Sequence, residues 1–193
     1  MKSLENIKVL FGGAFNPPTV AHFKIGDILV NKYGATITYL PSSSVYNKNV
    51  EIISFNDRYN MLKLVTSKIG SGANISDYEK VQTEYKGTYL TLKDFKGYYF
   101  LIGYDQFVNL KNWINFPKLV SENKFLVIPR SGYDIENAKD NEIIRNNIDN
   151  FIFLDDFPIL EGSSTEFRLT HNKNIVIEEV YEYIKNNNLY EVK

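Results

Sequence analysis

Glycine, threonine and histidine residues lie close together near the start of the chain, in the segment Gly12-Gly13-Ala14-Phe15-Asn16-Pro17-Pro18-Thr19-Val20-Ala21-His22. The apolar run at residues 7–11 before it predicts a buried strand, and the apolar spacing over residues 21–32 predicts a helix after it. Glycine lets the backbone approach a ligand closely, and the N-terminal end of the following helix attracts negative charge. This combination is suited to binding a phosphate group.

The segment differs from the two best-known phosphate motifs. It is neither the dinucleotide fingerprint Gly-x-Gly-x-x-Gly nor the lysine-containing loop of the ATPases. Taken singly, glycines after a strand often form only a turn, and a histidine near a helix start is more often a cap or a core residue. The assignment of this segment to phosphate chemistry therefore depends on motifs elsewhere in the chain.

The elements that would position this segment alternate between strands and helices. Further strands are predicted at residues 36–40, 74–76, 98–102, 125–128 and 151–154, and further helices at residues 57–69 and near the C-terminus, around residues 175–184. Such alternation predicts an α/β protein with a Rossmann-like, doubly wound parallel sheet and helices on both faces. In a sheet of this kind ligands bind beyond the carboxyl ends of the strands, where the strand order reverses, and residues 12–22 would occupy such a place.

Length and composition restrict the function further. The 193 residues are expected to form a single domain, and the net charge of −1 gives no indication of a nucleic-acid partner. No apolar run approaches the roughly 20 residues that span a bilayer, and no signal peptide is recognised, so we expect a cytoplasmic protein without a membrane partner. The absence of cysteine excludes disulfides, thiolate metal sites and a thiol nucleophile.

The segment resembles a known signature, and other motifs follow it in order. It is similar to the nucleotidyltransferase pattern Gly-x-Phe-[Asp/Asn]-Pro-x-[His/Thr]-x-Gly-His, and the chain resembles the nicotinate/nicotinamide mononucleotide adenylyltransferases almost from end to end. The motifs that carry this second resemblance are Lys48 with residues 54–58 and 61–62, residues 76–79 with 88–92, residues 102–105 with Leu110 and Trp113, and residues 128–133, 163–168 and 180–190.

The resemblance implies a reaction in which a mononucleotide phosphate oxygen attacks the α-phosphorus of ATP and pyrophosphate leaves. His22, Thr19 and Arg168 would be the catalytic residues, His22 by stabilising the charge on the leaving group. A C-terminal helical portion at about residues 163–193 would complete the ATP site within one nucleotidyltransferase domain of residues 1–193. The residues implied to contact ATP are Gly12, Gly13, Ala14, Phe15, Thr19, His22, Gly103, Asp105, Ser163, Ser164, Thr165 and Arg168.

The resemblance also implies a site for the second substrate. Trp113 would stack on the pyridine ring, and Thr88, through its backbone amide, would lie near the nicotinate carboxylate or nicotinamide amide. The residues implied to bind the mononucleotide are Lys48, Thr88, Tyr104, Trp113 and Arg130. Mg²⁺ is expected as the cofactor, held mainly by the ATP phosphates, so that no metal site of the protein's own is required. Homo-oligomers are common in this family.

Several positions depart from the family pattern. The bacterial enzymes usually have His-x-Gly-His where this chain has Thr19-Val20-Ala21-His22, Ala14 lacks a hydroxyl often found there, and Lys86-Gly87 replaces Ser-Tyr. Two alternatives therefore stay open besides an adenylyltransferase acting on either pyridine mononucleotide. One is another enzyme of the superfamily, such as a pantetheine-phosphate adenylyltransferase or a cytidylyltransferase, and the other is a catalytically silent nucleotide-binding homologue.

Overall fold

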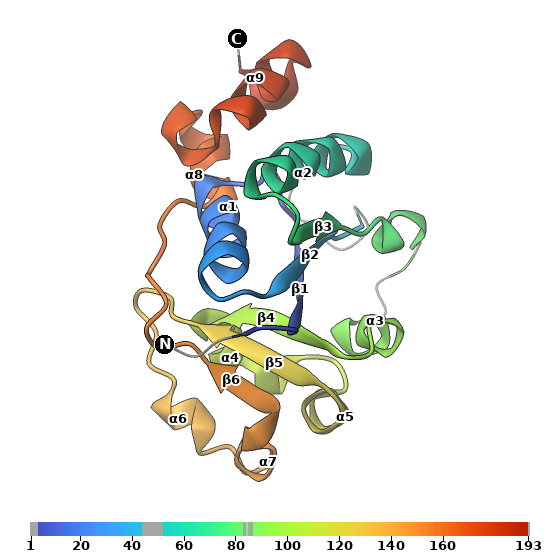
Figure 1. Ribbon diagram of the computed structural model, residues 1–193, viewed down its shortest axis with the longest axis vertical. Helices are drawn as coiled ribbons and strands as arrows, with labels where there is room; N and C mark the ends of the chain where they lie inside the picture. The colour runs from blue at the N-terminus through green and yellow to red at the C-terminus, as the bar shows by residue number, and fades with distance from the viewer. Residues whose placement is uncertain (1–3, 44–51, 83, 85–86, 193) are drawn as a thin grey trace. The chain divides into compact units, whose positions relative to one another are not determined.

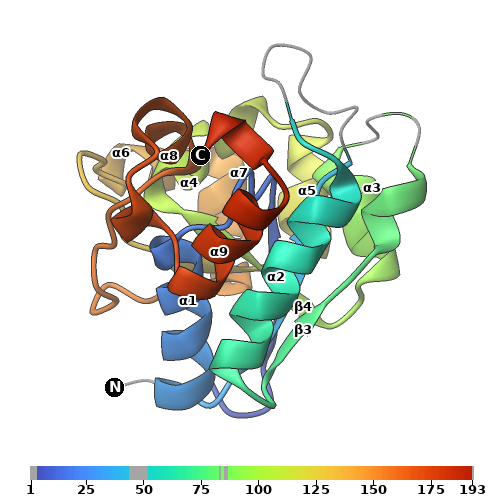
Figure 2. The same ribbon diagram turned by 90° about the horizontal axis from the view of Figure 1, so that it is seen from above.

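A computed structural model of the chain describes residues 4–43, 52–82, 84 and 87–192 (Figures 1 and 2). Its parallel strands are hydrogen-bonded in the order β3-β2-β1-β4-β5-β6, which is the order of a Rossmann-like sheet. The predicted α/β fold class is therefore confirmed. The strands are β1 (Lys8–Gly13), β2 (Thr36–Pro41), β3 (Ala73–Ile75), β4 (Tyr98–Gly103), β5 (Lys124–Ile128) and β6 (Phe151–Phe153).

The connections between strands are helical. The helices are α1 (Val20–Asp27), α2 (Phe55–Ile69), α3 (Thr88–Asp94), α4 (Tyr104–Asn109), α5 (Phe116–Glu122), α6 (Glu136–Lys139), α7 (Glu142–Asn146), α8 (Ser164–Thr170) and α9 (Glu178–Asn186). A π-helical turn, Ile28–Lys32, continues α1, and 3₁₀ turns occupy Tyr78–Val81, Leu110–Asn112, Ile148–Asn150, Lys173–Ile175 and Leu189–Glu191. In this described part of the chain no helix is long and apolar enough to cross a bilayer.

The described residues divide into two compact units, of which the first comprises residues 7–11 and 87–159. It holds the first part of β1 together with β4, β5 and β6, and Val9 pairs with Tyr99 in parallel register. Its core contains buried aromatic rings, with Phe125 stacked on Phe151 at 5.0 Å between centroids and Phe107 edge-on to Phe151 at 5.4 Å. Apolar strands buried on both faces are typical of parallel sheets.

The second unit comprises residues 4–6, 12–82, 84 and 160–192 in its described part. It holds the end of β1, strands β2 and β3, and helices α1, α2, α8 and α9. Figure 2 shows α9, from the end of the chain, lying beside α2, and polar side-chain contacts join the two helices. Tyr183 bonds Asp57 and Asn60, and Lys68 pairs with Glu179 at 2.6 Å.

The boundaries differ from the sequence-based expectation at three places. Strand β1 continues through both glycines, because the carbonyl of Gly13 accepts a hydrogen bond from the Ser42 amide at 2.9 Å. The helix expected over residues 21–32 changes to a π-helical turn at Ile28. Ile175, expected in the last helix, lies in a separate 3₁₀ turn, because the backbone is extended at Val176 before α9 begins.

Replacing Gly26 by alanine tests the packing of α1. An added Cβ would overlap the hydroxyl of Tyr39 and lie 2.7 Å from Cδ1 of Ile69, and the Tyr39 hydroxyl is held by its bond to the His22 carbonyl at 2.8 Å. We expect Gly26→Ala to lower the free energy of unfolding by about 1–3 kcal/mol, since overpacking outweighs the gain in helix propensity. Urea unfolding measures this, and Lys24→Ala, an exposed change on the same helix, should stay within about 0.5 kcal/mol of the wild type. A Gly26→Ala protein as stable as Lys24→Ala would contradict the prediction.

Candidate functional site

Thr19 and His22 form a reciprocal cap at the start of α1. The Thr19 hydroxyl accepts a 3.5 Å hydrogen bond from the His22 amide, and the Thr19 amide donates to Nδ1 of His22 at 2.9 Å. Because Nδ1 accepts a hydrogen bond, the imidazole is neutral and carries its proton on Nε2. His22 is thus oriented as a hydrogen-bond donor through Nε2 at the N-terminal end of a helix.

The loop between β1 and α1 (residues 14–19, hereafter the β1–α1 loop) contacts the C-terminal segment. Ser164 donates its hydroxyl hydrogen to the carbonyl of Pro17 at 2.7 Å, and Arg168 Nη1 donates to the carbonyl of Asn16 at 2.6 Å. The Thr19 hydroxyl donates to the carbonyl of Gly162 at 3.3 Å. Two motifs separated by more than 140 residues in the sequence therefore meet in the second unit.

The serine-rich turn is also the cap of α8. Ser163 accepts a hydrogen bond from the amide of Glu166 at 3.1 Å, and the Thr165 hydroxyl accepts one from Arg168 Nη2 at 3.1 Å. The second unit thus gathers most of the residues expected to bind ATP. They are Gly12, Gly13, Ala14, Phe15, Thr19, His22, Ser163, Ser164, Thr165 and Arg168. Thr19 itself is 1% exposed and its hydroxyl bonds protein atoms, so in this structure it orients His22.

The two other residues expected to bind ATP lie in the first unit, with Gly103 as the last residue of β4 and Asp105 in α4. Asp105 in α4 forms an ion pair with Arg130 at 3.7 Å between Oδ2 and Nε. A Cβ on Gly103 would lie 2.5 Å from Oδ1 of Asp105, so the carboxylate lies directly over this glycine. Strand order reverses between β1 and β4, as in other Rossmann-like sheets.

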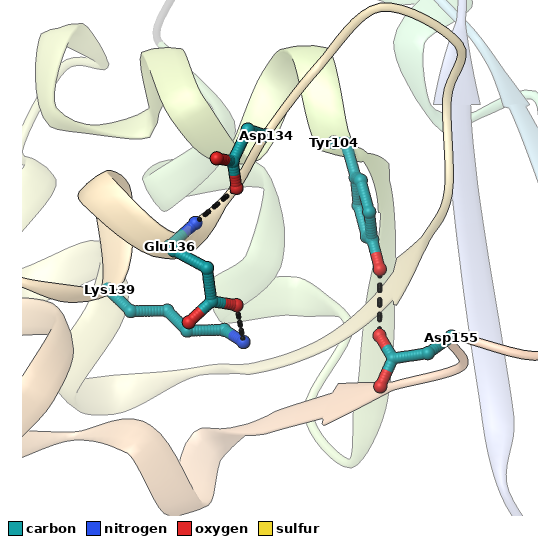
Figure 3. A network of polar contacts seen from close by, with 5 residues as sticks. All are labelled: Tyr104, Asp134, Glu136, Lys139 and Asp155. Atoms are coloured by element: carbon teal, nitrogen blue, oxygen red, sulfur yellow. Dashed lines mark hydrogen bonds and ion pairs between the residues drawn. The ribbon is translucent and has the colours of Figure 1, made fainter.

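Tyr104 begins α4 and points toward Asp155 beyond the end of β6. Figure 3 shows its hydroxyl donating to Oδ1 of Asp155, at 2.7 Å, next to a second group in which Glu136 bonds Asp134 and Lys139. Burial, and then the hydrogen bond to Asp155, raise the pKa of Tyr104 well above its usual range. Tyr104 is therefore a neutral donor at any physiological pH.

Trp113 follows the 3₁₀ turn Leu110–Asn112, and Thr88 begins α3, both in the first unit. Trp113 is half-buried, with its ring edge-on to Phe100 at 6.2 Å between centroids. Thr88 is the first residue of α3, so its backbone N–H has no acceptor inside the helix. The turn at Gly87 lies against Ile114, because a Cβ there would be 3.2 Å from Cβ of Ile114, and this contact brings Thr88 close to the neighbour of Trp113. Lys48 lies outside the described residues.

Sequence reasoning did not assign a role to three residues that support the β1–α1 loop. Asn16 is 2% exposed, and its Oδ1 accepts hydrogen bonds from the Tyr190 hydroxyl at 2.7 Å and the Ile53 amide at 3.4 Å. Arg58 Nη1 donates to the carbonyl of Ala14 at 2.8 Å. Asn16, Arg58 and Tyr190 all lie inside segments that resemble family motifs, and this was the available signal.

The described residues, which exclude 44–51 among others, contain no group of three or more His, Asp or Glu side chains that could hold a metal ion.

The strand order and the histidine-capped loop after β1 define an α/β nucleotide-binding protein. The model of the cytidylyltransferase-like family matches residues 10–170 of the chain. The chain belongs to the cytidylyltransferase-like family.

Two bacterial relatives are similar along nearly the whole chain. A protein of Clostridium acetobutylicum, named as a probable nicotinate-nucleotide adenylyltransferase, is 32% identical over 95% of this chain and 98% of its own length. A protein of Clostridium tetani with the same name is 30% identical over the same shares. The solved structure of Plasmodium falciparum nicotinic acid mononucleotide adenylyltransferase complexed with APC has a TM-score of 0.78 at 24% identity, covering 96% of this chain and 98% of that chain, and this likeness supports the fold.

Replacing Thr19 by valine tests the cap of α1. The change removes a buried hydroxyl that bonds the carbonyl of Gly162 and the amide of His22. We expect a loss of about 1–3 kcal/mol in the free energy of unfolding, because a buried carbonyl and a first-turn amide lose their partner. Thr36→Val makes the same chemical change at an exposed position and should shift stability by no more than about 0.5 kcal/mol. Equal effects of the two substitutions in urea unfolding would disprove the role of the cap.

Proposed function

We propose that this protein is a nicotinate-nucleotide adenylyltransferase. It transfers the adenylyl group of ATP to nicotinate mononucleotide and releases pyrophosphate and the deamido form of NAD. The observation that carries the proposal is the junction of the β1–α1 loop with the α8 segment: Arg168 and Ser164 donate to the carbonyls of Asn16 and Pro17, in the loop that leads to the cap formed by Thr19 and His22. The names of relatives that match 95% of the chain support the same activity.

The reaction needs charge stabilisation more than a protein nucleophile. A phosphate oxygen of the mononucleotide forms the new bond to the α-phosphorus of ATP as the bond to the β-phosphate oxygen breaks. His22 donates from Nε2 to the phosphates and stabilises the charge that develops on pyrophosphate. Arg168 binds the outer phosphates together with the turn formed by Ser163, Ser164 and Thr165. The backbone of residues 12–15 lies along the same phosphates.

The other candidate residues bind the rest of the two substrates in this proposal. The Asp105 carboxylate, over Gly103, accepts hydrogen bonds from the ribose hydroxyls of ATP. Trp113 stacks on the pyridine ring, and the Thr88 amide donates to the nicotinate carboxylate, which is a stronger acceptor than an amide. Tyr104, Arg130 and Lys48 complete the mononucleotide contacts, the two cations toward its phosphate.

Mg²⁺ fits this site as an ion held by substrate oxygens. Since the described residues offer no cluster of three ligating side chains, the ATP phosphates provide most of the ligands. When bound, the ion neutralises phosphate charge and polarises the α-phosphorus. In this arrangement His22 and Arg168 position the phosphate groups of ATP.

Three further expectations stay predictions: one nucleotidyltransferase domain over residues 1–193, a cytoplasmic location and homo-oligomeric assembly.

A substrate comparison tests the proposed activity. Purified protein with ATP and Mg²⁺ is expected to release pyrophosphate and form the deamido-dinucleotide with nicotinate mononucleotide, and to turn over nicotinamide mononucleotide more slowly because the amide is a weaker acceptor. Phosphopantetheine with ATP, and CTP with phosphocholine, serve as controls for the other enzymes of the superfamily. Product from a control pair but from neither pyridine mononucleotide would reject the proposal, and no product at all would favour a silent homologue.

Replacing His22 by alanine tests its catalytic role. We expect kcat to fall by about 100-fold or more, because a preorganised donor to the developing charge is lost. Far-ultraviolet circular dichroism should be unchanged. His171→Asn, which replaces the other histidine at a left-handed position that asparagine tolerates, should change kcat by less than about threefold. A drop of less than tenfold in His22→Ala would mean that His22 is structural.

A further inference from the structure

Arg58 is a fully buried cation without a carboxylate partner. It lies in α2 with 0% of its surface exposed, and in the described part of the chain no acidic side chain forms an ion pair with it. The adjacent Asp57 carboxylate bonds Ser54 and Tyr183 instead. One guanidinium nitrogen, Nη2, is buried and has no hydrogen-bond partner among the described residues. A buried charge of this kind opposes folding, so its presence calls for an explanation from what it contacts.

The contacts of Arg58 are with backbone carbonyl groups near the β1–α1 loop. Nη1 donates to the carbonyl of Ala14 at 2.8 Å, and Nε donates to the carbonyl of Ile53 at 3.3 Å. The ring of Phe55 lies 5.5 Å from the guanidinium carbon. Burial lowers the pKa of Arg58, yet a guanidinium stays charged in proteins. The planar guanidinium presents separate N–H donors to the two carbonyls.

The bond to Ala14 fixes the orientation of a peptide that leads directly to Phe15. In a trans peptide the N–H points away from the C=O, so the amide of Phe15 faces away from Arg58. Phe15 adopts a left-handed backbone conformation with φ of 49°, which is unfavourable for a residue with a bulky side chain. The surrounding contacts must therefore hold it there.

Phe15 in turn contacts the side chain of His22. Its ring is 2% exposed and lies edge-on to the imidazole at 5.0 Å between centroids and to Tyr39 at 5.6 Å. The Tyr39 hydroxyl donates to the carbonyl of His22 at 2.8 Å. A continuous series of contacts thus runs from Arg58 through the Ala14–Phe15 peptide to the imidazole, all within the second unit.

We propose that Arg58 is a positioning residue for His22: its bond to the Ala14 carbonyl holds the left-handed Phe15, whose ring sets the orientation of the imidazole. Arg58 acts from behind the loop and need not touch the nucleotide. Its charge also lies on the side of the loop opposite the Phe15 amide, where it favours an anionic ligand. The expected effect on kcat and KM rests on the proposed function. The expected effect on the orientation of the His22 imidazole does not.

The first measurement is spectroscopic and does not require activity. With two histidines in the chain, ¹⁵N-histidine labelling gives two imidazole spin systems, and His171→Asn assigns them. In the wild type we expect the His22 pattern of an accepting Nδ1 and a protonated Nε2. In Arg58→Met we expect this pattern to average toward a mixture of tautomers. Lys68→Met, which removes an exposed cation from the same helix, is the matched control and should leave the His22 signals in place.

The second measurement is steady-state kinetics. In Arg58→Met we expect kcat to fall and the KM for ATP to rise, each by about 10- to 100-fold, because a displaced His22 misaligns the phosphates. The KM for nicotinate mononucleotide should stay within about threefold of the wild type, as should all constants of Lys68→Met. If Arg58→Met does not fold, Arg58→Lys decides by the same readouts, since it keeps the charge and loses the planar, forked arrangement of donors.

The outcomes separate the two proposals. A folded Arg58→Met or Arg58→Lys protein with unchanged His22 signals, and with kcat and KM for ATP within about threefold of the wild type, would overturn the positioning role. Should the wild type fail to use nicotinate mononucleotide, the proposed function fails. Two measurements would then still decide the role of Arg58. One is the set of His22 spectra, and the other compares how much inorganic tripolyphosphate raises the melting temperature of the wild type and of Arg58→Met.

Discussion

Backbone carbonyl groups of the β1–α1 loop accept hydrogen bonds from side chains on two helices, and the geometry around His22 depends on these bonds. Ala14 is held by Arg58 from α2, while Asn16 and Pro17 are held by Arg168 and Ser164 from α8. The loop contains consecutive prolines, which have no N–H, so it cannot satisfy its carbonyls through a regular backbone pattern. Side-chain donors from distant segments are the remaining way to bury it.

The same bonds explain why the C-terminal segment belongs to the site. Asn16 bonds the Tyr190 hydroxyl and Arg168, and Tyr183 of α9 bonds Asp57 in α2. A segment that begins far along the sequence is thereby attached to the loop after the first strand. Its serine turn then presents a helix start beside the loop, and helix starts attract phosphate.

The fold was largely predictable because apolar runs bounded by glycine or proline are reliable signals of buried parallel strands. The runs at residues 98–102 and 125–128 appear as β4 and β5 almost as expected. The errors in the element boundaries have physical causes outside the local sequence. The backbone of Gly12 and Gly13 extends β1 because Ser42 supplies a hydrogen-bond donor, a partner that no local pattern reveals. The bond of the Thr19 hydroxyl to the Gly162 carbonyl likewise depends on a contact across the chain, which residue type does not reveal.

The sequence by itself determined the parallel α/β class, the order of the motifs and the residues able to donate to phosphate, since periodicity and residue type are local properties. Tertiary structure decided which nitrogen of His22 carries the proton, how the Asp105 carboxylate lies over Gly103, and why a buried arginine stands behind the loop. These features depend on donors and acceptors that meet only after folding. Hydrogen-bond direction and burial are properties of such pairs, and a single sequence does not specify which pairs form.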